Sequence, residues 1–128
     1  SLPDIEGDRD KLHQVFLNLI RNAIEASPEG GEVTIRSSFC SQWQLAGKHL
    51  TPQRKYMLIE VEDQGPGVND KHISQLFRPL FTTKPNGHGL GLSISYRIIQ
   101  SHGGLLNYQP IPISGALFQV YLPTQQLG

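Results

Sequence analysis

Apolar residues recur every three or four positions between Asp8 and Ser27, and this spacing predicts an amphipathic helix. Asn18 and Asn22 are four positions apart, so they project from one side, along the border of the apolar stripe. Asparagine is a poor mid-helix residue because its amide competes for backbone hydrogen bonds. The pair therefore suggests amide oxygens directed into a cleft. Such neutral oxygens suit a magnesium ion that keeps several waters and shares its other ligands with phosphates.

The stretch from Tyr56 to Asp63 is predicted to be a strand. Because side chains alternate along a strand, one face would hold three apolar residues and a carboxylate, namely Met57, Ile59, Val61 and Asp63. An unpaired buried carboxylate is costly, so Asp63 either caps the following turn or meets a specific donor. An Asx-type turn before Gly65 is the simpler interpretation. The alternative is an ionised acceptor at the bottom of an apolar pocket, suited to a base with an exocyclic amine that Gly65 and Gly67 would let the backbone approach.

The remaining pattern completes a two-layer α/β domain. Between Glu32 and Phe39, Val33 and Ile35 alternate with polar residues, which predicts a half-buried strand with these two side chains inward. The polar stretch 41–55 is expected to be a long hairpin tip without evident chemistry. Farther along we expect a short helix, a mobile loop, a longer helix and two antiparallel strands, over residues 70–77, 79–87, 89–102, 105–108 and 116–122. The last strand would point Phe118, Val120 and Leu122 inward.

Glycine occupies every second position in Gly87-His88-Gly89-Leu90-Gly91, and an apolar, helix-like run follows at once. This spacing leaves room for a backbone to pass close to a ligand and then begin a helix whose free N–H groups face it. A helix N-terminus of this kind binds anions, and phosphate is the obvious guest. Glycine pairs also end helices and form turns, so the interpretation depends on the two segments described above.

Four motifs in order resemble those of a known family. They are Asn-Leu-Ile-Arg-Asn-Ala (18–23), Asp-Gln-Gly-Pro-Gly (63–67), Leu-Phe-Arg-Pro-Leu-Phe-Thr-Thr-Lys (76–84) and Gly-His-Gly-Leu-Gly-Leu (87–92). They resemble the N, first glycine, F and second glycine boxes in the catalytic and ATP-binding domains of two-component sensor histidine kinases. The match runs from about Asp8 to Leu122. The Phe-Thr-Thr-Lys wording and the long stretch between the first two central strands most resemble the nitrogen-regulation (NtrB-like) branch.

The resemblance implies a Bergerat-type (GHKL) ATP-binding fold, a two-layer α/β sandwich in which helices cover one face of a mixed sheet. Residues 1–128 would form one catalytic and ATP-binding domain, with the dimerisation, phosphoacceptor and sensor regions outside it. Family members have a short strand just before the segment matching Ser1–Pro3. We therefore expect this strand to be missing, and the exposed edge to favour pairing between copies.

The resemblance also implies ATP and Mg²⁺ as cofactors and assigns site residues. The adenine would be held by the first glycine box, through Asp63, Gly65 and Gly67. Asn22 would ligate magnesium, and Asn18 would lie beside it near the triphosphate. Lys84 would reach the phosphates from the mobile loop 79–87, which forms the lid of the site in this family. Asn18 and Lys84 are thus the candidate catalytic residues. The lid and the helix start would complete the ATP-binding set with Gly87, His88, Gly89, Leu90 and Gly91.

One position departs from the family pattern. Many members have a lysine three positions after the second asparagine, where this chain has Glu25. Charge neutralisation of the phosphates must then come from elsewhere, which increases the importance of Lys84 and makes Arg78 a further candidate. Phosphoryl transfer depends mainly on positioning and charge compensation, so losing one cation is tolerable but not free.

Two other activities use related pockets. Gyrase, MutL-type repair proteins and the heat-shock chaperone hydrolyse ATP with a glutamate at the position matching Asn18, where it activates water. An amide cannot act as that base, so a kinase is favoured over a GHKL-type ATPase or conformational switch. An anti-sigma-type serine kinase is the second alternative, although the F-like segment 76–84 argues against it.

The acceptor histidine of such a kinase is usually followed by an acidic residue and, a few positions on, by a proline. None of the five histidines has that setting: His13, His49, His72, His88 and His102. We therefore expect the acceptor upstream, on dimerisation helices of a homodimeric full-length protein, with a response regulator as the second partner. His102 precedes Gly103 and is expected at a helix C-terminus, where a cation is favourable.

Composition limits the other possibilities. The 128 residues suffice for one domain with a core, and 38% hydrophobic residues argue against disorder. The 11 basic and 11 acidic residues cancel, which removes the electrostatic case for nucleic acid or anionic lipid. Cys40 is the only cysteine, which excludes an internal disulfide and fits a reducing compartment. No apolar run approaches membrane-spanning length, so we expect a cytoplasmic domain without direct membrane contact, whose parent could be anchored upstream.

Overall fold

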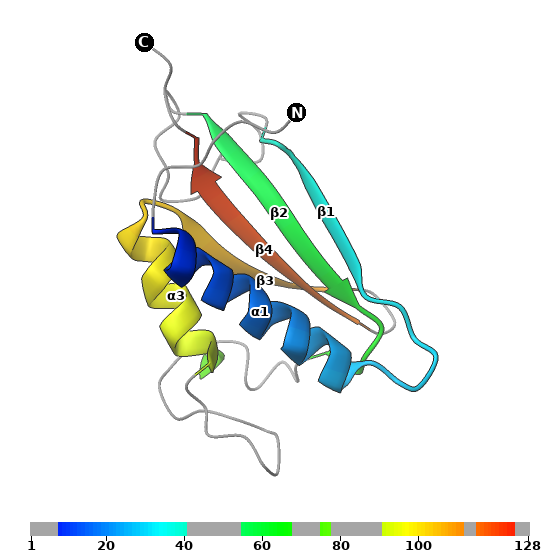
Figure 1. Ribbon diagram of the computed structural model, residues 1–128. Helices are drawn as coiled ribbons and strands as arrows, with labels where there is room; N and C mark the ends of the chain where they lie inside the picture. The colour runs from blue at the N-terminus through cyan, green and yellow to red at the C-terminus, as the bar shows by residue number, and fades with distance from the viewer. Residues whose placement is uncertain (1–7, 41–54, 68–74, 78–90, 112–114, 125–128) are drawn as a thin grey trace.

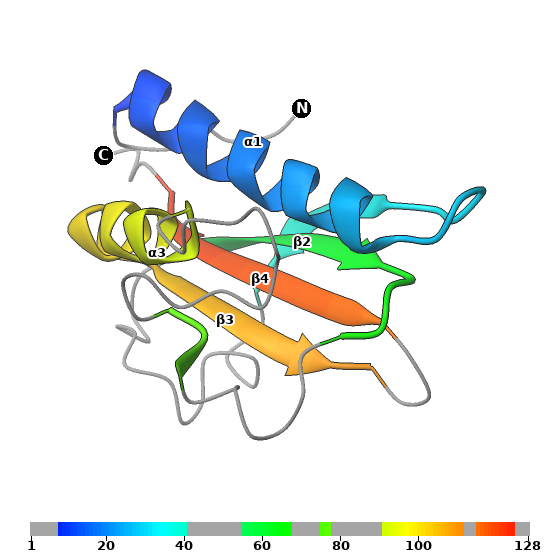
Figure 2. The same ribbon diagram turned by 90° about the horizontal axis from the view of Figure 1, so that it is seen from below.

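In the part of the chain that the structure describes, a four-stranded sheet carries two helices on one face (Figures 1 and 2). The computed structural model describes residues 8–40, 55–67, 75–77, 91–111 and 115–124. The elements run in the order α1 (Arg9–Ala26), β1 (Thr34–Phe39), β2 (Tyr56–Asp63), α3 (Gly91–Ser101), β3 (Leu105–Pro110) and β4 (Ala116–Pro123). The strand order is β1-β2-β4-β3, and each neighbouring pair is antiparallel. The two-layer arrangement is confirmed, whereas the mixed strand directions that we expected are not found among the described strands.

Helix α1 begins and ends close to the predicted limits. Asp8 is the N-cap, and its Oδ1 accepts hydrogen bonds from the backbone N–H groups of Asp10 and Lys11 at 3.0 and 3.2 Å. Such a cap satisfies N–H groups that a helix leaves unpaired at its first turn. The buried residues of α1 recur every fourth position, at Val15, Leu19 and Ala23. The periodicity of the sequence therefore gave both the helix and its buried face.

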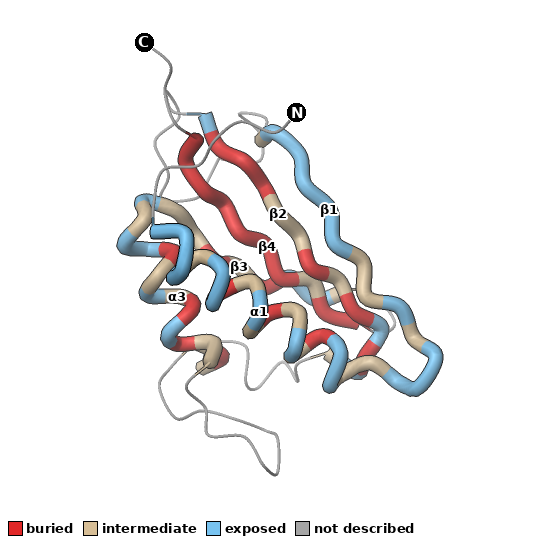
Figure 3. Tube along the Cα trace, viewed as in Figure 1, coloured by how far each residue is buried: buried red, intermediate tan, exposed pale blue. Residues whose placement is uncertain are grey.

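The main core fills the space between the helices and the sheet (Figure 3). It joins the buried face of α1 and Ile99 of α3 to inward residues of β2, β3 and β4. The inward positions of the two central strands include Val61, Phe118, Val120 and Leu122, which confirms the alternation predicted for them. A second, smaller cluster lies on the other face of the sheet and contains Tyr56, Leu58 and Tyr121, with Cys40 and Leu105 packed against it.

Strand β1 forms one edge of the sheet, and its burial was predicted correctly for only one of two residues. Val33, just before β1, packs against the main core as expected. Ile35 was expected to point inward but is 54% exposed, although its register partner Val61 is buried. The helices pack on β2, β3 and β4, so β1 lies beyond their cover. Ile35 does lie on the face of the sheet that the helices cover elsewhere, but at this edge no helix covers that face.

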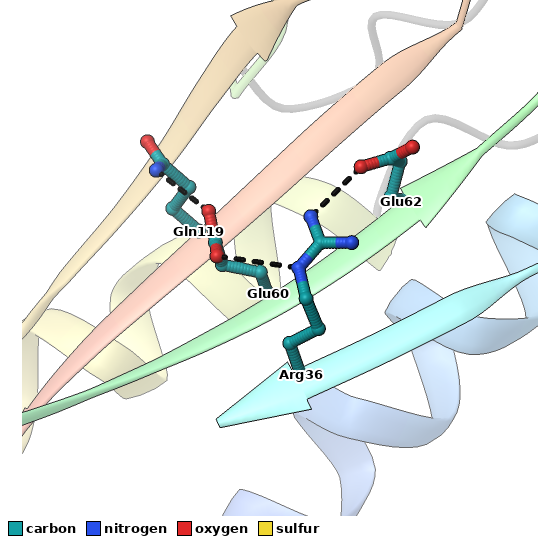
Figure 4. Close-up of polar contacts among 4 residues, drawn as sticks. All are labelled: Arg36, Glu60, Glu62 and Gln119. Atoms are coloured by element: carbon teal, nitrogen blue, oxygen red, sulfur yellow. Dashed lines mark hydrogen bonds and ion pairs between the residues drawn. The ribbon is translucent and has the colours of Figure 1, made fainter. Parts of the chain in front are cut away.

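A polar row crosses all four strands on the outer face of the sheet. Arg36, Glu60, Gln119 and Asn107 are direct register partners from β1 to β3. Gln119 accepts a hydrogen bond from Asn107 at 3.0 Å. It also donates to Oε2 of Glu60 at 3.0 Å, while Arg36 donates to Glu62 at 2.7 Å and lies 3.6 Å from Glu60 (Figure 4). The bond to Glu62 is the main cause of the raised pKa of Arg36. Exposed ion pairs add little to stability, so the main effect of this row is to favour the observed pairing register of the four strands.

The two helices run antiparallel, and a histidine connects the end of α3 to the start of α1. His102 follows α3, and its Nε2 accepts a hydrogen bond from the backbone N–H of Asp8 at 2.9 Å. Its Nδ1 lies 2.7 Å from the carbonyl oxygen of Ile98, so the ring proton belongs on Nδ1. The predicted position at a helix C-terminus is confirmed.

Candidate functional site

Asp63 is the last residue of β2 and is buried, with 4% exposure. Its Oδ1 accepts a hydrogen bond from the backbone N–H of Gly65 at 2.8 Å, so the Asx-type turn is confirmed. A carboxylate has two oxygens and about four lone-pair sites, so this turn does not exhaust its capacity as an acceptor. The turn also holds the carboxylate on the inward face of the sheet, where the sequence predicted an acceptor.

The loop that follows Asp63 packs tightly against the C-terminal end of α1. A Cβ on Gly65 would lie 2.4 Å from the carbonyl oxygen of Ala26, so only glycine fits there. Two side-chain hydrogen bonds stabilise this close packing. Ser27 Oγ accepts from the backbone N–H of Gln64 at 3.5 Å, and Gln64 Oε1 accepts from the backbone N–H of Glu32 at 3.1 Å. Neither Ser27 nor Gln64 was singled out in the sequence, and no signal marked them. Together they place the Asp63 loop beside α1.

Gly67 has a different reason to be glycine. Its φ is 76°, in the left-handed region, and a Cβ would lie 2.7 Å from the carbonyl oxygen of Gly115. The hydroxyl of Tyr108 would lie 3.3 Å from the same Cβ. The two glycines of this motif are thus required by the packing of the chain on itself, whatever a ligand adds.

The two asparagines of α1 lie where the helical spacing placed them. Asn18 and Asn22 are half-buried and flank Leu19 and Ala23, which are buried, so the predicted border position is confirmed. Nδ2 of Asn18 donates to Oγ of Ser95 at 3.5 Å, which links α1 to α3. Ser95 is fully buried and was missed in the sequence. A polar residue on the apolar face of a predicted helix was the signal that could have revealed it.

Helix α3 begins at Gly91, within the second glycine motif. No atom of a described residue lies within 4 Å of the position that a Cβ on Gly91 would take. Asn18 meets Ser95, which lies one turn after Gly91 on the same helix. The glycine at 91 is not required by contacts with described residues.

Part of the F-like motif is anchored beside α3. Leu76 is buried in the main core, and the ring of Phe77 stacks on that of Tyr96 with centroids 5.0 Å apart. Phe77 also meets Phe118 of β4 edge to face at 6.4 Å. Aromatic pairs at such distances contribute packing energy beyond their buried area. The F-like motif is thus attached to the same layer as Asn18 and Gly91.

The structure brings part of the predicted site together. Gly65, held by the turn at Asp63, approaches the end of α1 at Ala26, whereas Gly67 packs against Gly115. Asn18 meets Ser95 of α3, one turn after Gly91. Five predicted site residues and one further candidate lie outside the described residues: Lys84, Gly87, His88, Gly89, Leu90 and Arg78.

A shallow hollow of about 360 Å³ runs along the exposed side of α1. Its lining consists of Asp10, His13, Gln14, Leu17, Asn18 and Arg21, so Asn18 is the predicted site residue that it reaches. The described residues contain no group of three or more His, Cys, Asp and Glu that could hold a metal. No helix in the described part of the chain is long and apolar enough to cross a membrane.

Comparison with known proteins agrees with this geometry. The model of the histidine kinase-, DNA gyrase B- and HSP90-like ATPase family matches residues 7–126. The chain is 41% identical over 130 residues to the sensory histidine kinase/phosphatase NtrB of Azospirillum brasilense. That alignment covers 96% of this chain and 31% of the relative, so the chain spans about a third of the length of that curated protein.

Solved structures give the same result. The mycobacterial sensor histidine kinase MprB superposes with a TM-score of 0.80 at 26% identity, covering 96% of this chain and 78% of that one. Full-length ShkA in complex with AMPPNP superposes with a TM-score of 0.76 at 26% identity, covering 99% of this chain and 24% of that one. The chain therefore belongs to the family of histidine kinase-, DNA gyrase B- and HSP90-like ATPases, and within it resembles the catalytic part of sensor histidine kinases such as NtrB.

Proposed function

We propose that residues 1–128 form a domain that binds Mg-ATP and transfers its γ-phosphoryl group to a histidine on the dimerisation helices of its own kinase. The phosphoryl group would then be relayed to a response regulator. The observation that carries the proposal is the convergence of three motifs: the Asp63 loop packs on Ala26, and Asn18 meets α3 one turn from Gly91. The complex of ShkA with AMPPNP supports a site for an adenine nucleotide on this fold.

Adenine recognition is assigned to Asp63. Its carboxylate is buried and oriented by the Gly65 N–H, so it offers a fixed acceptor in an apolar setting. A hydrogen bond from the exocyclic amine of adenine to such an ionised acceptor is charge-assisted and stronger than a neutral one. This contact would set the position of the rest of the nucleotide along the seam between α1 and α3.

The residues present fit a magnesium ion at Asn22. Asn22 is half-buried on the same row of α1 as Asn18, and an amide oxygen suits an ion that takes its other ligands from phosphates and water. Bound there, the ion would neutralise charge on the phosphates during transfer. Asn18, one turn earlier, would contact the triphosphate side of the same row.

The amide of Asn18 also favours a kinase over a hydrolase. Activation of water needs a general base, and a neutral amide cannot accept the proton. The nucleotide would therefore be held until the acceptor histidine arrives. Because Glu25 occupies the position where many family members have lysine, Lys84 would supply the compensating cation.

The partners follow from this chemistry. The acceptor lies on the dimerisation helices of a homodimeric parent, the response regulator receives the phosphoryl group, and the reaction takes place in the cytoplasm. A GHKL-type ATPase or an anti-sigma-type serine kinase would use the same nucleotide pocket, and these are the alternatives that the second experiment below distinguishes.

The first test is nucleotide binding measured by calorimetry on Asp63→Asn. Asparagine keeps an oxygen for the Gly65 N–H, but it loses the charge and faces the adenine amine with a neutral group. We expect affinity for ADP and ATP to fall by about tenfold or more, which corresponds to ~1.4 kcal/mol. Glu62→Gln is the matched control, because Glu62 lies on the opposite face at the same end of β2 and pairs with Arg36. Equal affinity for both variants would refute the pocket assignment.

The second test is the product of the reaction. The domain alone should release little phosphate and should not phosphorylate itself, and adding the dimerisation helices of its parent should restore histidine phosphorylation. Fast phosphate release by the domain alone would indicate the ATPase. An acid-stable phosphoserine would indicate the serine kinase.

A further inference from the structure

Ser95 is a polar residue at a position where the fold needs none. Its side chain is fully buried on α3, near Ile99 and Leu92 of the main core. Burying a hydroxyl costs free energy unless it finds a hydrogen-bond partner. Alanine would also be the better residue in a helix interior, because serine competes for backbone hydrogen bonds. Stability alone would therefore favour alanine at this position.

The polar contact that the structure gives Ser95 is with a candidate site residue. Its Oγ accepts from Nδ2 of Asn18 at 3.5 Å, across the seam between the two helices. The contact is long for a hydrogen bond, so it adds little to stability. It nevertheless fixes the orientation seen in the structure, in which Oγ accepts from Nδ2, the donor end of the amide. With Nδ2 turned to Ser95, Oδ1 of Asn18 is turned away from it.

We propose that Ser95 is a positioning residue, which holds the amide of Asn18 so that Oδ1, and not Nδ2, faces the magnesium ion. This inference rests on the proposed function, in which Asn18 lies one turn from the magnesium ligand Asn22. Without Ser95 the terminal torsion of Asn18 is broad and nearly two-fold, so both ends of the amide would face the nucleotide in turn. Phosphoryl transfer depends on positioning, and a displaced group slows it even when the nucleotide remains bound.

The test uses the full-length parent kinase, with autophosphorylation from labelled ATP and thermal unfolding measured on the same samples. Ser95→Ala should lower kcat by about two- to tenfold, the range for the loss of one neutral hydrogen bond. The KM for ATP should change less than twofold, because adenine affinity is assigned to Asp63. The Tm should stay the same or rise. A purely structural role for Ser95 would instead lower the Tm and leave kcat unchanged.

Two further variants make the result specific. Ser95→Thr keeps the hydroxyl but adds a methyl group to a fully buried site, so it should lower the Tm while keeping more kcat than Ser95→Ala. Ser101→Ala is the control, because Ser101 is on the same helix but is exposed, and its hydrogen bonds to described residues are local, with the carbonyl of Ile98 and the ring of His102. It should not change kcat. A kcat that follows the Tm across these variants would overturn the inference.

Asn18→Ala separates this inference from the function on which it rests. If Asn18→Ala lowers kcat and Ser95→Ala does not, the positioning role is wrong and the proposed function is unaffected. If Asn18→Ala leaves kcat unchanged, the role of Asn18 fails and the inference fails with it. In the Asn18→Ala background, Ser95→Ala should cause no further loss, because the residue on which it acts is absent.

Discussion

Alanine at Gly65 and alanine at Gly91 should change stability in opposite directions and weaken nucleotide binding for different reasons. At Gly65 the new Cβ would lie 2.4 Å from the carbonyl oxygen, 2.9 Å from the carbonyl carbon and 3.0 Å from the Cβ of Ala26. These are atoms of a helix end and cannot move aside by a change of rotamer. At Gly91 no atom of a described residue lies within 4 Å of the new Cβ.

The magnitudes follow from these distances. Overpacking of this kind costs about 1–3 kcal/mol, so Gly65→Ala should lower the Tm by about 3–12 °C. Gly91→Ala removes a glycine from the first turn of α3, which should raise the Tm slightly, for a gain of at most ~1 kcal/mol. Its methyl group would nevertheless occupy the space assigned to phosphate. Affinity for ATP should therefore fall by about tenfold, or ~1.4 kcal/mol.

Differential scanning calorimetry of the ligand-free proteins and titration with Mg-ATP measure the two effects separately. A drop in Tm for Gly91→Ala as large as that for Gly65→Ala would show that the start of α3 is packed against protein. A higher Tm for Gly91→Ala with unchanged affinity for ATP would show that phosphate does not bind at the start of α3. An unchanged Tm for Gly65→Ala would contradict the close approach of the Asp63 loop to α1.

The remaining predictions concern a cation, a phenol and a histidine. Lys84→Ala should weaken the binding of ATP more than that of ADP, and a non-hydrolysable ATP analogue should slow hydrogen exchange over residues 79–89, because we expect this loop to close over the triphosphate as a lid. Equal effects on the two nucleotides, or unchanged exchange, would refute this role of the loop. Burial, with smaller contributions from Cys40 and Glu60, raises the pKa of Tyr121 to about 12. Its contribution to stability should be complete below about pH 10 and be lost as the pH rises towards 12, and urea unfolding of Tyr121→Phe should lack that decline. Nitrogen shifts of His102 should place the ring proton on Nδ1 and the acceptor at Nε2, and a proton on Nε2 would contradict the hydrogen bond from Asp8.

The sequence was sufficient wherever a residue's role depends on its neighbours along the chain. Helical spacing placed Val15, Leu19 and Ala23 in the core and Asn18 and Asn22 at its border. Strand alternation placed Asp63 on the buried face. These patterns repeat every 3.6 or 2 residues, so a short stretch of sequence is enough to show them. The order of the four motifs added the family, which the comparisons confirm.

Only the tertiary structure decided the properties that depend on residues distant in sequence. Ile35 alternates correctly yet is exposed, because β1 lies at the edge of the sheet beyond the helices. Gly65 must be glycine because the end of α1 comes within contact of it. Ser95 acquires its proposed role from Asn18, 77 positions away, and His102 accepts a hydrogen bond from Asp8, 94 positions away. Such contacts form when the chain folds on itself, so no local periodicity records them.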